Sequence, residues 1–382
     1  MKLLEYKGKE LLKEYGIPIQ NGVVVQENQD IKESIKALNP PYVLKVQIMA
    51  GGRGKAGGIK FAESPDEAEK LAKEMLQMEI KKLKVRKVLI AEKVDLADEW
   101  YLSIVLDRFN KAPMLIFSPL GGVDIEETAK NNPEKIVKIP INFFMGIKEY
   151  TIRYIFKKYD LDLALTEAFT SIVKNLYKLF IEYDCTLTEI NPLAIIGDGK
   201  LLAVDCKADI DNSSLYRHSD IAEFRNSIEE NALIKEARQF NFLYIPVTDE
   251  GNIAVVSNGS GMIMSCIDLI TKNVQKVGAA LDLGGGATSD RIAEAVKIIF
   301  KNKNIMCLFI SIFGGITRCD EVALGVKAAL DSGEIEKDRV VVIRLEGTNK
   351  PEALKILSEI GSNVIIADSI SDGVSKISSR RF

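Results

Sequence analysis

The feature that most constrains the fold is a repeated pattern in the second part of the chain. An apolar run, a glycine turn and a helical pattern follow one another three times, beginning at "NIAVVSNGSG", "AALDLGGGATSD" and "CLFISIFGGITRCD". Two further apolar runs, "RVVVIRLEG" and "NVIIADS", each precede another helical pattern. Continuous apolar strands that alternate with helices are typical of a parallel sheet covered on both faces. The pattern predicts a doubly wound α/β domain over residues 236–382.

The first part of the chain mixes helices and strands without this regularity. The segment "SPDEAEKLAKEMLQMEIKKL" predicts a capped helix, and it lies between two predicted strands, "GIKFAE" and "KVLIAEK". Such an irregular order is typical of an α+β domain. A chain of 382 residues is also too long for one ordinary core. We therefore expect a first domain over residues 1–235.

Composition excludes several classes of protein. The formal net charge of −3 argues against a general nucleic-acid binder. The longest apolar runs, such as "IMCLFISIF", are far too short to span a membrane. The cysteines are scattered through apolar runs without the paired spacing of metal ligands, which indicates buried thiols in a reducing compartment. We expect a soluble, cytoplasmic protein with neither nucleic acid nor membrane as a partner.

The glycine-rich segment "KVQIMAGGRGKAGGIKFAES" (residues 45–64) predicts a phosphate-binding loop. Its glycines let backbone N–H groups approach an anion, and Lys45, Arg53 and Lys55 add positive charge. It is not a Walker loop, because Ala56 follows the Gly-Lys pair and the chain returns to a strand instead of a helix. We interpret it as a glycine flap between two strands. The alternative is a flexible hairpin tip with solubilising charges.

A predicted hairpin, "TEINPLAIIGDGKLLAVDCK" (residues 188–207), supplies candidate metal ligands. If it is symmetric about Asp198, Asn191 lies opposite Asp205 and Glu189 opposite Lys207, all on one face. The other face would carry the core residues Ile190, Leu202, Val204 and Cys206. Neighbouring amide and carboxylate oxygens are ligands that Mg²⁺ accepts together with substrate phosphates. The alternative is a Glu189–Lys207 salt bridge and nothing more.

The segment "VLIAEKVDLADEWYLSIVLD" contains a short acidic link between two predicted strands. Backbone groups of such a link suit a purine edge, and Glu99 suits ribose hydroxyls. Alternatively, Glu99 is only a solvated carboxylate.

The three glycine turns of the second domain predict a ligand crevice. Each turn places a helix N-terminus at the carboxyl edge of the sheet, where N–H groups favour anions. Thr317 and Asp320 in "ITRCD" match a helix-capping pattern. Cys319 is in the same predicted first turn, and we interpret it as a structural thiol instead of a reactive one.

Seven motifs in order give the whole chain a family resemblance. They are "LLEYKGKELLKEYGIP", "KVQIMAGGRGKAGG", "LTEINPL", "VSNGSG", "LDLGGGAT", "FGGITRCD" and "VIRLEG". The chain resembles the β subunits of succinyl-CoA synthetases, also called succinate–CoA ligases. The resemblance implies an ATP-grasp domain followed by a flavodoxin-like CoA-ligase domain.

The resemblance also implies roles for particular residues. Those implied for the nucleotide are Lys45, Gly52, Arg53, Gly54, Ala91, Val94 and Glu99. The implied Mg²⁺ ligands are Asn191 and Asp205, the implied carboxylate site is Asn258, Gly315, Ile316 and Thr317, and Glu189 would orient or charge-balance a phosphorylated histidine. Better-known members have a glutamate where Ala91 stands. Gln20 replaces a proline of the ATP-preferring bacterial type, which leaves the choice between ATP and GTP open.

The implied reaction joins succinate to CoA and cleaves ATP or GTP to the diphosphate and phosphate. A histidine would carry the phosphoryl group, but the only histidine is His218, which we expect at the surface. In the family, the phosphohistidine and most of the CoA site belong to an α subunit, so we expect a heterodimer or heterotetramer. A malate–CoA ligase subunit is the nearest alternative. A nucleotide- or CoA-binding regulatory module is another, which intact Lys45, Asn191 and Asp205 argue against.

Overall fold

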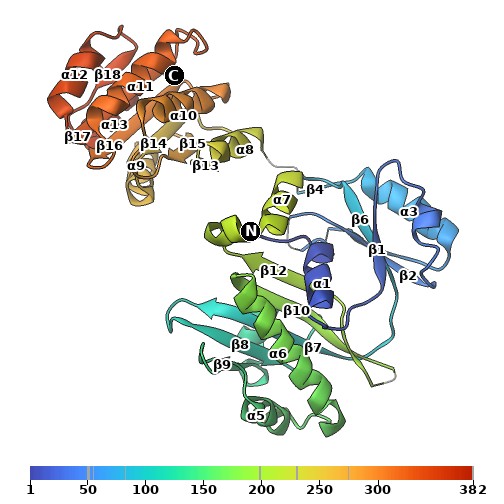
Figure 1. Ribbon diagram of the computed structural model, residues 1–382. Helices are drawn as coiled ribbons and strands as arrows, with labels where there is room; N and C mark the ends of the chain where they lie inside the picture. The colour runs from blue at the N-terminus through green and yellow to red at the C-terminus, as the bar shows by residue number, and fades with distance from the viewer. Residues whose placement is uncertain are drawn as a thin grey trace. The chain divides into compact units, whose positions relative to one another are not determined.

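The computed structural model divides the chain into two compact units, Met1–Ser227 and Ile228–Phe382 (Figure 1). It describes residues 1–49, 52–54, 56–81, 83–197, 199–228, 231–273 and 275–380. Helix α8 (Ala232–Gln239) contains the position between residues 235 and 236 at which we placed the domain boundary. This helix packs on β13 (Leu243–Pro246) and α10 (Ser289–Lys301) of unit 2. We therefore propose that an independently folding second domain begins before α8.

Unit 1 contains a small sheet in the order β1-β6-β2-β3. Its strands are β1 (Gly22–Gln26), β2 (Tyr42–Val46), β3 (Ile59–Ala62) and β6 (Lys87–Glu92). Helix α3 (Pro65–Leu76) packs on it, and Ser64 caps that helix by accepting from the backbone N–H of Glu67. The helix predicted from the sequence ends earlier than expected, because residues after Met78 form β4 (Glu79–Ile80), which pairs with β5 (Leu83–Lys84). Helix α2 (Ile31–Ser34) lies beside α3.

The larger sheet of unit 1 has the order β11-β10-β7-β8-β9, with β12 also paired to β10. Its strands are β7 (Leu96–Asp107), β8 (Ala112–Ser118), β9 (Val137–Pro140), β10 (Cys185–Ile196), β11 (Leu201–Ala203) and β12 (Cys206–Ile210). The helices of this part are α1 (Glu5–Glu14), α4 (Ile125–Asn131), α5 (Glu149–Tyr159), α6 (Thr166–Glu182) and α7 (Ser219–Ser227), with 3₁₀ turns at Pro133–Lys135, Leu163–Leu165 and Asn212–Arg217. Helix α6 crosses β10 and β7, and α1 packs on β12 (Figure 1). Helix α1 thereby lies against the predicted metal hairpin.

The predicted register of the hairpin is confirmed. Leu193 pairs with Ala203 and Glu189 with Lys207, as symmetry about residue 198 requires, although Asp198 lies outside the described residues. The predicted core face is wrong in its second strand. Leu201 and Ala203 are buried where Leu202 and Val204 were expected. The strand breaks between β11 and β12, and the buried positions change from odd to even numbers across that break.

Unit 2 contains a six-stranded sheet in the order β13-β15-β14-β16-β17-β18. Its remaining strands are β14 (Ile253–Ser257), β15 (Val277–Asp282), β16 (Cys307–Gly314), β17 (Val340–Gly347) and β18 (Val364–Ile366). All pairs are parallel except β13 with β15. In chain order the five parallel strands run 2-1-3-4-5, which is the flavodoxin-like order. The predicted parallel sheet is confirmed, and the antiparallel edge strand β13 was not foreseen.

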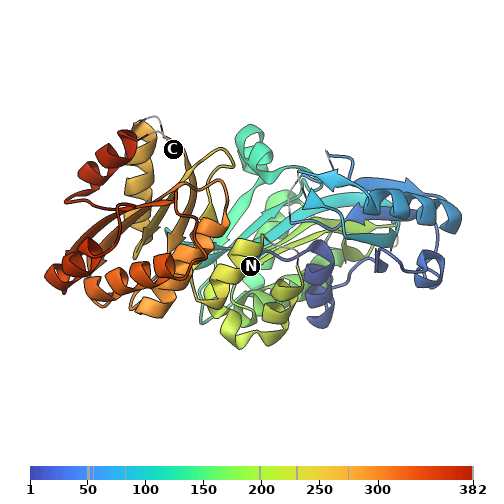
Figure 2. The ribbon, with the colours of Figure 1, turned by 90° about the horizontal axis from the view of Figure 1, so that it is seen from above.

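Helices cover both faces of this sheet (Figure 2). On one face, α10 and its neighbours α11 (Cys319–Asp331) and α12 (Lys350–Ser358) bury residues such as Val256 and Ile310. On the other face, α9 (Ser260–Lys272) and α13 (Ile370–Ser378) bury residues such as Phe309. This double burial explains why the strands are continuously apolar in sequence. In the described part of the chain, no helix is both long and apolar enough to cross a membrane.

Candidate functional site

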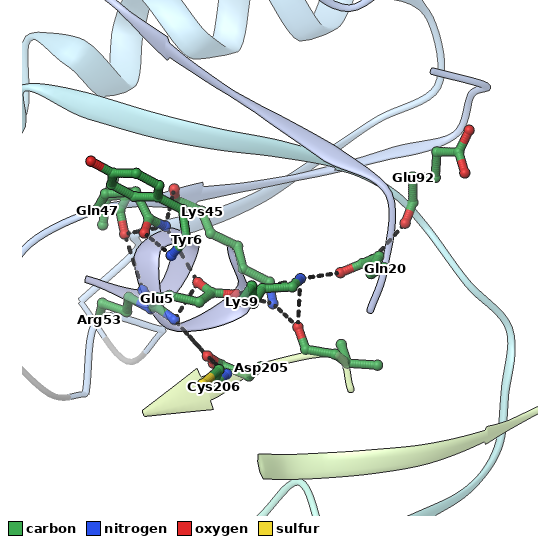
Figure 3. A network of polar contacts seen from close by, with 12 residues as sticks. Glu5, Tyr6, Lys9, Gln20, Lys45, Gln47, Arg53, Glu92, Asp205 and Cys206 are labelled. Carbon is green, nitrogen blue, oxygen red and sulfur yellow. Dashed lines mark hydrogen bonds and ion pairs between the residues drawn. The ribbon is translucent and has the colours of Figure 1, made fainter. Parts of the chain in front are cut away.

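Two of the three cations predicted to bind phosphates, Lys45 and Arg53, meet in a buried polar cluster of unit 1 (Figure 3). Lys45 on β2 donates to the Glu5 carboxylate at 3.0 Å and to the carbonyl of Val204 at 3.0 Å. Arg53, from the glycine flap, lies 2.5 Å from the other Glu5 oxygen. It also donates to both carboxylate oxygens of Asp205, at 3.1 and 3.0 Å. The structure therefore brings the flap, β2 and the β11–β12 connection together around Glu5.

The charges in this cluster shift one another's protonation. Burial alone would raise the pKa of Glu5, but the charges of Lys45, Arg53 and Lys9 outweigh it and hold that pKa below its ordinary value. Burial lowers the pKa of Lys9 to about 8. Burial, followed by repulsion from Glu5, raises the pKa of Asp205 despite the nearby cations. Glu5 is therefore the carboxylate that the cations stabilise most clearly.

The described residues of the glycine flap form tight turns. Gly58 donates to the carbonyl of Arg53 at 2.9 Å, and Gly52 has a φ of +71°, which favours glycine. A Cβ on Gly58 would lie 2.6 Å from a Val46 methyl group, so this position also needs glycine for space. Gly52 and Gly54 are exposed, whereas the predicted cation Lys55 lies outside the described residues.

Of the two predicted Mg²⁺ ligands, Asn191 lies on β10 and Asp205 lies in the break between β11 and β12. Between them, the N–H of Val204 donates to the carbonyl of Pro192 at 3.1 Å. Asn191 Oδ1 accepts from the N–H of Gly122 at 2.8 Å, whereas Asp205 is bonded to Arg53. Among the described residues, no hydrogen bond joins the two side chains. Their oxygens are the hard donors that Mg²⁺ prefers, so the donor set fits this ion.

Glu99 and Asn191 meet at the turn after β8. The N–H of Gly121 donates to the carbonyl of Glu99 at 2.7 Å. The side chain of Glu99 covers Gly122, where an added Cβ would lie 2.1 Å from its Oε2. Asn191 also donates to the carbonyl of Val123 at 3.0 Å. The predicted ribose ligand and the predicted metal ligand thus share one glycine turn, which the sequence interpretation missed.

The remaining residues of the predicted purine link lie at the end of β6. Ala91 is fully buried within the small sheet, where it pairs with Gly22 and Val43, and Val94 is half-buried in the link. Gln20 donates from its side chain to the carbonyl of Glu92 at 2.5 Å and accepts from Lys9 at 3.3 Å. Gln20 therefore connects the link to the cluster around Glu5.

Glu189 on β10 is held by Tyr101 instead of Lys207. The Tyr101 hydroxyl donates to Glu189 Oε2 at 2.9 Å, and burial raises the pKa of Glu189. Lys207 lies opposite in the register and is exposed, but the described residues include no ion pair between the two. The simple salt bridge that we weighed as an alternative is therefore wrong. Glu189 is a half-buried carboxyl fixed by a phenol.

The glycine turns of unit 2 are joined by side chains of the predicted carboxylate site. Asn258 donates to the carbonyl of Phe313 at 2.8 Å and accepts from its N–H at 3.3 Å. The Thr317 hydroxyl accepts from Gly286 N at 3.0 Å and from Ala287 N at 3.4 Å. Ile316, in contrast, is 87% exposed. The predicted convergence of the turns at the carboxyl edge of the sheet is confirmed.

The predicted capping role of Thr317 is wrong. Helix α11 begins at Cys319, and Arg318 occupies the N-cap without a side-chain hydrogen bond. Thr317 instead serves the neighbouring glycine turn, and the N–H of Gly315 donates to its carbonyl at 3.2 Å. Cys319 is fully buried, and burial raises its pKa. Its interpretation as a structural thiol is confirmed, and the other four cysteines are also free and buried.

His218 differs from the expected surface residue. Its ring stacks on Tyr183 with centroids 5.2 Å apart, and Nε2 lies 2.7 Å from a carboxylate oxygen of Asp184. Its side chain is only 11% exposed. Arg217 also pairs with Asp184. The expectation of an exposed side chain is wrong, and the ring is committed to a structural contact.

Comparisons with known proteins agree with this arrangement. The ATP-grasp domain family matches residues 2–195, and the CoA-ligase family matches residues 256–376. The chain is 40% identical to a protein of Desulfatibacillum aliphaticivorans over 99% of both chains, and equally so to one of Bacillus subtilis. Both are named succinate–CoA ligase [ADP-forming] subunit beta. A solved ATP citrate lyase from Methanothrix soehngenii has a similar fold, with a TM-score of 0.77, 17% identity and 99% of both chains covered.

Proposed function

This chain belongs to the family of succinate–CoA ligase β subunits, and from that premise we propose that it is the nucleotide-binding subunit of an ADP-forming succinate–CoA ligase. The observation that carries the proposal is the meeting of Lys45 and Arg53 with Asp205 in one buried cluster. It combines phosphate-binding cations with a carboxylate of the hairpin that also carries Asn191 and Glu189. We propose ATP as the nucleotide because the relatives are named ADP-forming.

The residues of unit 1 would act mainly by binding and orientation. Lys45 and Arg53 bind the phosphates and offset charge on the group in transfer, which is the main task of a phosphoryl-transfer site. The backbone N–H groups of Gly52 and Gly54, two exposed residues, contribute further donors. Glu99 accepts from the ribose hydroxyls, and the backbone near Ala91 and Val94 contacts the purine.

Asn191 and Asp205 would hold Mg²⁺, which supplies charge neutralisation on the nucleotide phosphates when it is bound. In the described conformation Asp205 is paired with Arg53, so the ion and the guanidinium would compete for the same carboxylate. Asn191 keeps the Gly122 turn in place through its amide. Glu189 would orient the phosphorylated histidine, with its own position fixed by Tyr101.

In unit 2 the joined glycine turns would hold the carboxylate substrate. Backbone N–H groups at the edge of a parallel sheet suit an anion. Asn258, Gly315 and Ile316 lie at that edge, and Thr317 ties the FGG turn to the GGG turn. Succinate is the proposed substrate, and malate is the alternative because a pocket for one dicarboxylate needs few changes to accept the other.

We further propose that the phosphorylated histidine and most of the CoA site lie on a partner α subunit, in a heterodimer or heterotetramer. His218 is the only histidine of this chain, and its ring is held between Tyr183 and Asp184. The stacked ring is only 11% exposed, which leaves little room for a phosphoryl group or for the donors that would hold it. We also propose that the protein is cytoplasmic.

The test is a coupled assay on the chain purified with its partner subunit. ADP or GDP release is measured with succinate, malate and no carboxylate, in the presence of CoA. Succinate-dependent ADP release supports the proposal, and malate dependence would transfer it to malate–CoA ligase. Nucleotide binding without turnover under all conditions would support a regulatory module. Incubation of this chain alone with γ-labelled ATP should leave His218 unlabelled, and stoichiometric acid-labile label on it would refute the two-subunit scheme.

A further inference from the structure

Glu5 is an acidic side chain inside a site proposed for an anion. It lies at the start of α1, and its side chain is 1% exposed. Its two oxygens contact the proposed phosphate-binding groups, Lys45 at 3.0 Å and Arg53 at 2.5 Å. Gln47 adds a donor at 3.3 Å. Glu5 is thus an anion surrounded by two cations and an amide. A bound phosphate group would require the same set of donors.

Glu5 does not neutralise every buried cation near it equally. Lys9, one turn later on α1, lies 4.0 Å from Glu5 but donates instead to Gln20 and to the carbonyl of Val204. The contacts shorter than 3.2 Å thus fall on the two side chains assigned to the nucleotide and not on the neighbouring lysine. Arg53 links Glu5 to Asp205, so the same contacts hold the flap against the hairpin (Figure 3).

We propose that Glu5 is a positioning residue that occupies Lys45 and Arg53 in place of a nucleotide phosphate, so that the nucleotide binds by displacing an internal carboxylate. This inference rests on the proposed function, because it takes Lys45 and Arg53 as phosphate ligands. As the phosphates take over these cations, Arg53 leaves Asp205 and frees that carboxylate. Glu5 therefore lowers nucleotide affinity and keeps the nucleotide-free site folded. A purely structural carboxylate would have the opposite effect on affinity, because its loss would disorder the site.

The test measures ADP binding by titration calorimetry, with and without Mg²⁺, on the full-length wild-type chain and on Glu5→Gln. Glutamine keeps the shape and removes the charge, so we expect ADP affinity to rise about tenfold in both conditions. The melting temperature of the nucleotide-free variant should fall, because buried cations lose their counter-ion. Glu10→Gln, on the exposed side of the same helix, is the matched control and should change neither quantity.

Two further variants keep the test decisive. In Glu5→Gln with Lys9→Met, one negative and one positive charge are removed together, which restores folding if the single variant is unstable; its ADP affinity should also exceed that of the wild type. Glu5→Asp keeps the charge and should bind ADP as weakly as the wild type. Unchanged or weaker ADP binding by the folded charge-removing variants would overturn the inference while leaving the proposed function intact. A wild-type chain that binds neither ADP nor GDP would refute both.

Discussion

Replacing Gly122 with alanine should lower the nucleotide affinity of unit 1 by more than its modest loss of stability explains. Gly122 has a φ of +70°, and an added Cβ would lie 2.1 Å from Glu99 Oε2. Alanine in this left-handed conformation costs about 1–2 kcal/mol of stability. The clash adds little to that cost, because the carboxylate is the far end of a flexible side chain. Glu99 must, however, leave the position that it shares with Asn191, whose Oδ1 accepts from Gly122 N.

Gly199 supplies the matched control for this change. Its φ is +77°, but among the described residues beyond its chain neighbours no atom lies within 4 Å of an added Cβ. Gly199→Ala should therefore cost the same backbone strain without any clash. We expect both variants to lose about 1–2 kcal/mol in chemical denaturation. Only Gly122→Ala should lose nucleotide affinity, because the displaced Glu99 carboxylate would no longer accept from the ribose hydroxyls. A hydrogen bond to a charged acceptor contributes about 1.5–3 kcal/mol, so we expect a loss of about tenfold or more.

Calorimetric titration of both variants with ADP decides the question. Equal ADP affinities for Gly122→Ala and Gly199→Ala would refute the reasoning, because Glu99 would then be displaced without consequence. A larger loss of stability in Gly122→Ala than in Gly199→Ala would show that Glu99 cannot move aside, and it would contradict the assumed flexibility of its side chain.

Three other variants test the remaining assignments. Asp205→Ala should abolish ADP release in the coupled assay while circular dichroism stays unchanged, and full activity in the folded variant would contradict its role as a metal ligand. Lys45→Ala should raise the dissociation constant for ADP, and an unchanged constant would count against a phosphate contact. Asp184→Asn should lower the free energy of unfolding by about 1 kcal/mol at pH 7, since asparagine tolerates the left-handed backbone found there. Hydrogen bonding to Arg217 lowers the pKa of Asp184 below its ordinary value of 3.8, so the ion pair stabilises the fold above pH 3.8. The difference in unfolding free energy between wild type and variant should therefore disappear as pH falls through the lower pKa of the folded state. A difference that persists in acid would exclude the ion pair as its cause.

The sequence predicted features that depend on short repeats. The register of the hairpin follows from alternation about one turn, and the parallel sheet of unit 2 follows from buried strands between helices. The place where alternation fails, at Val204 and Asp205, was missed because a strand break leaves no regular pattern. The length of α3 was overestimated for a similar reason, since Glu79 and Ile80 continue a helical pattern but pair in a small ribbon.

Contacts between distant segments explain most of the errors at the site. Glu5 precedes Lys45 by 40 positions, and in sequence it reads as an ordinary polar residue of an amphipathic helix. Thr317 has a local capping pattern, but its hydroxyl is used by the turn at Gly286, 31 positions earlier. Local sequence patterns show which residue types are present, but tertiary packing determines which hydrogen-bond or ion-pair partner each side chain has. The family resemblance supplied the proposed ligands but not Glu5 or Gly122.

The antiparallel strand β13 has a consequence for any attempt to produce unit 2 alone. It pairs with β15 from Leu243–Asp282 to Pro246–Ala279, and it thereby covers one edge of the sheet. The CoA-ligase match begins only at residue 256, so a fragment cut to that match would lose β13 and most of β14. Unpaired N–H and C=O groups at an apolar strand edge recruit other chains. Such a fragment would aggregate through the exposed edges of β15 and β16, whereas one that begins at Ile228 keeps β14 and its own edge strand.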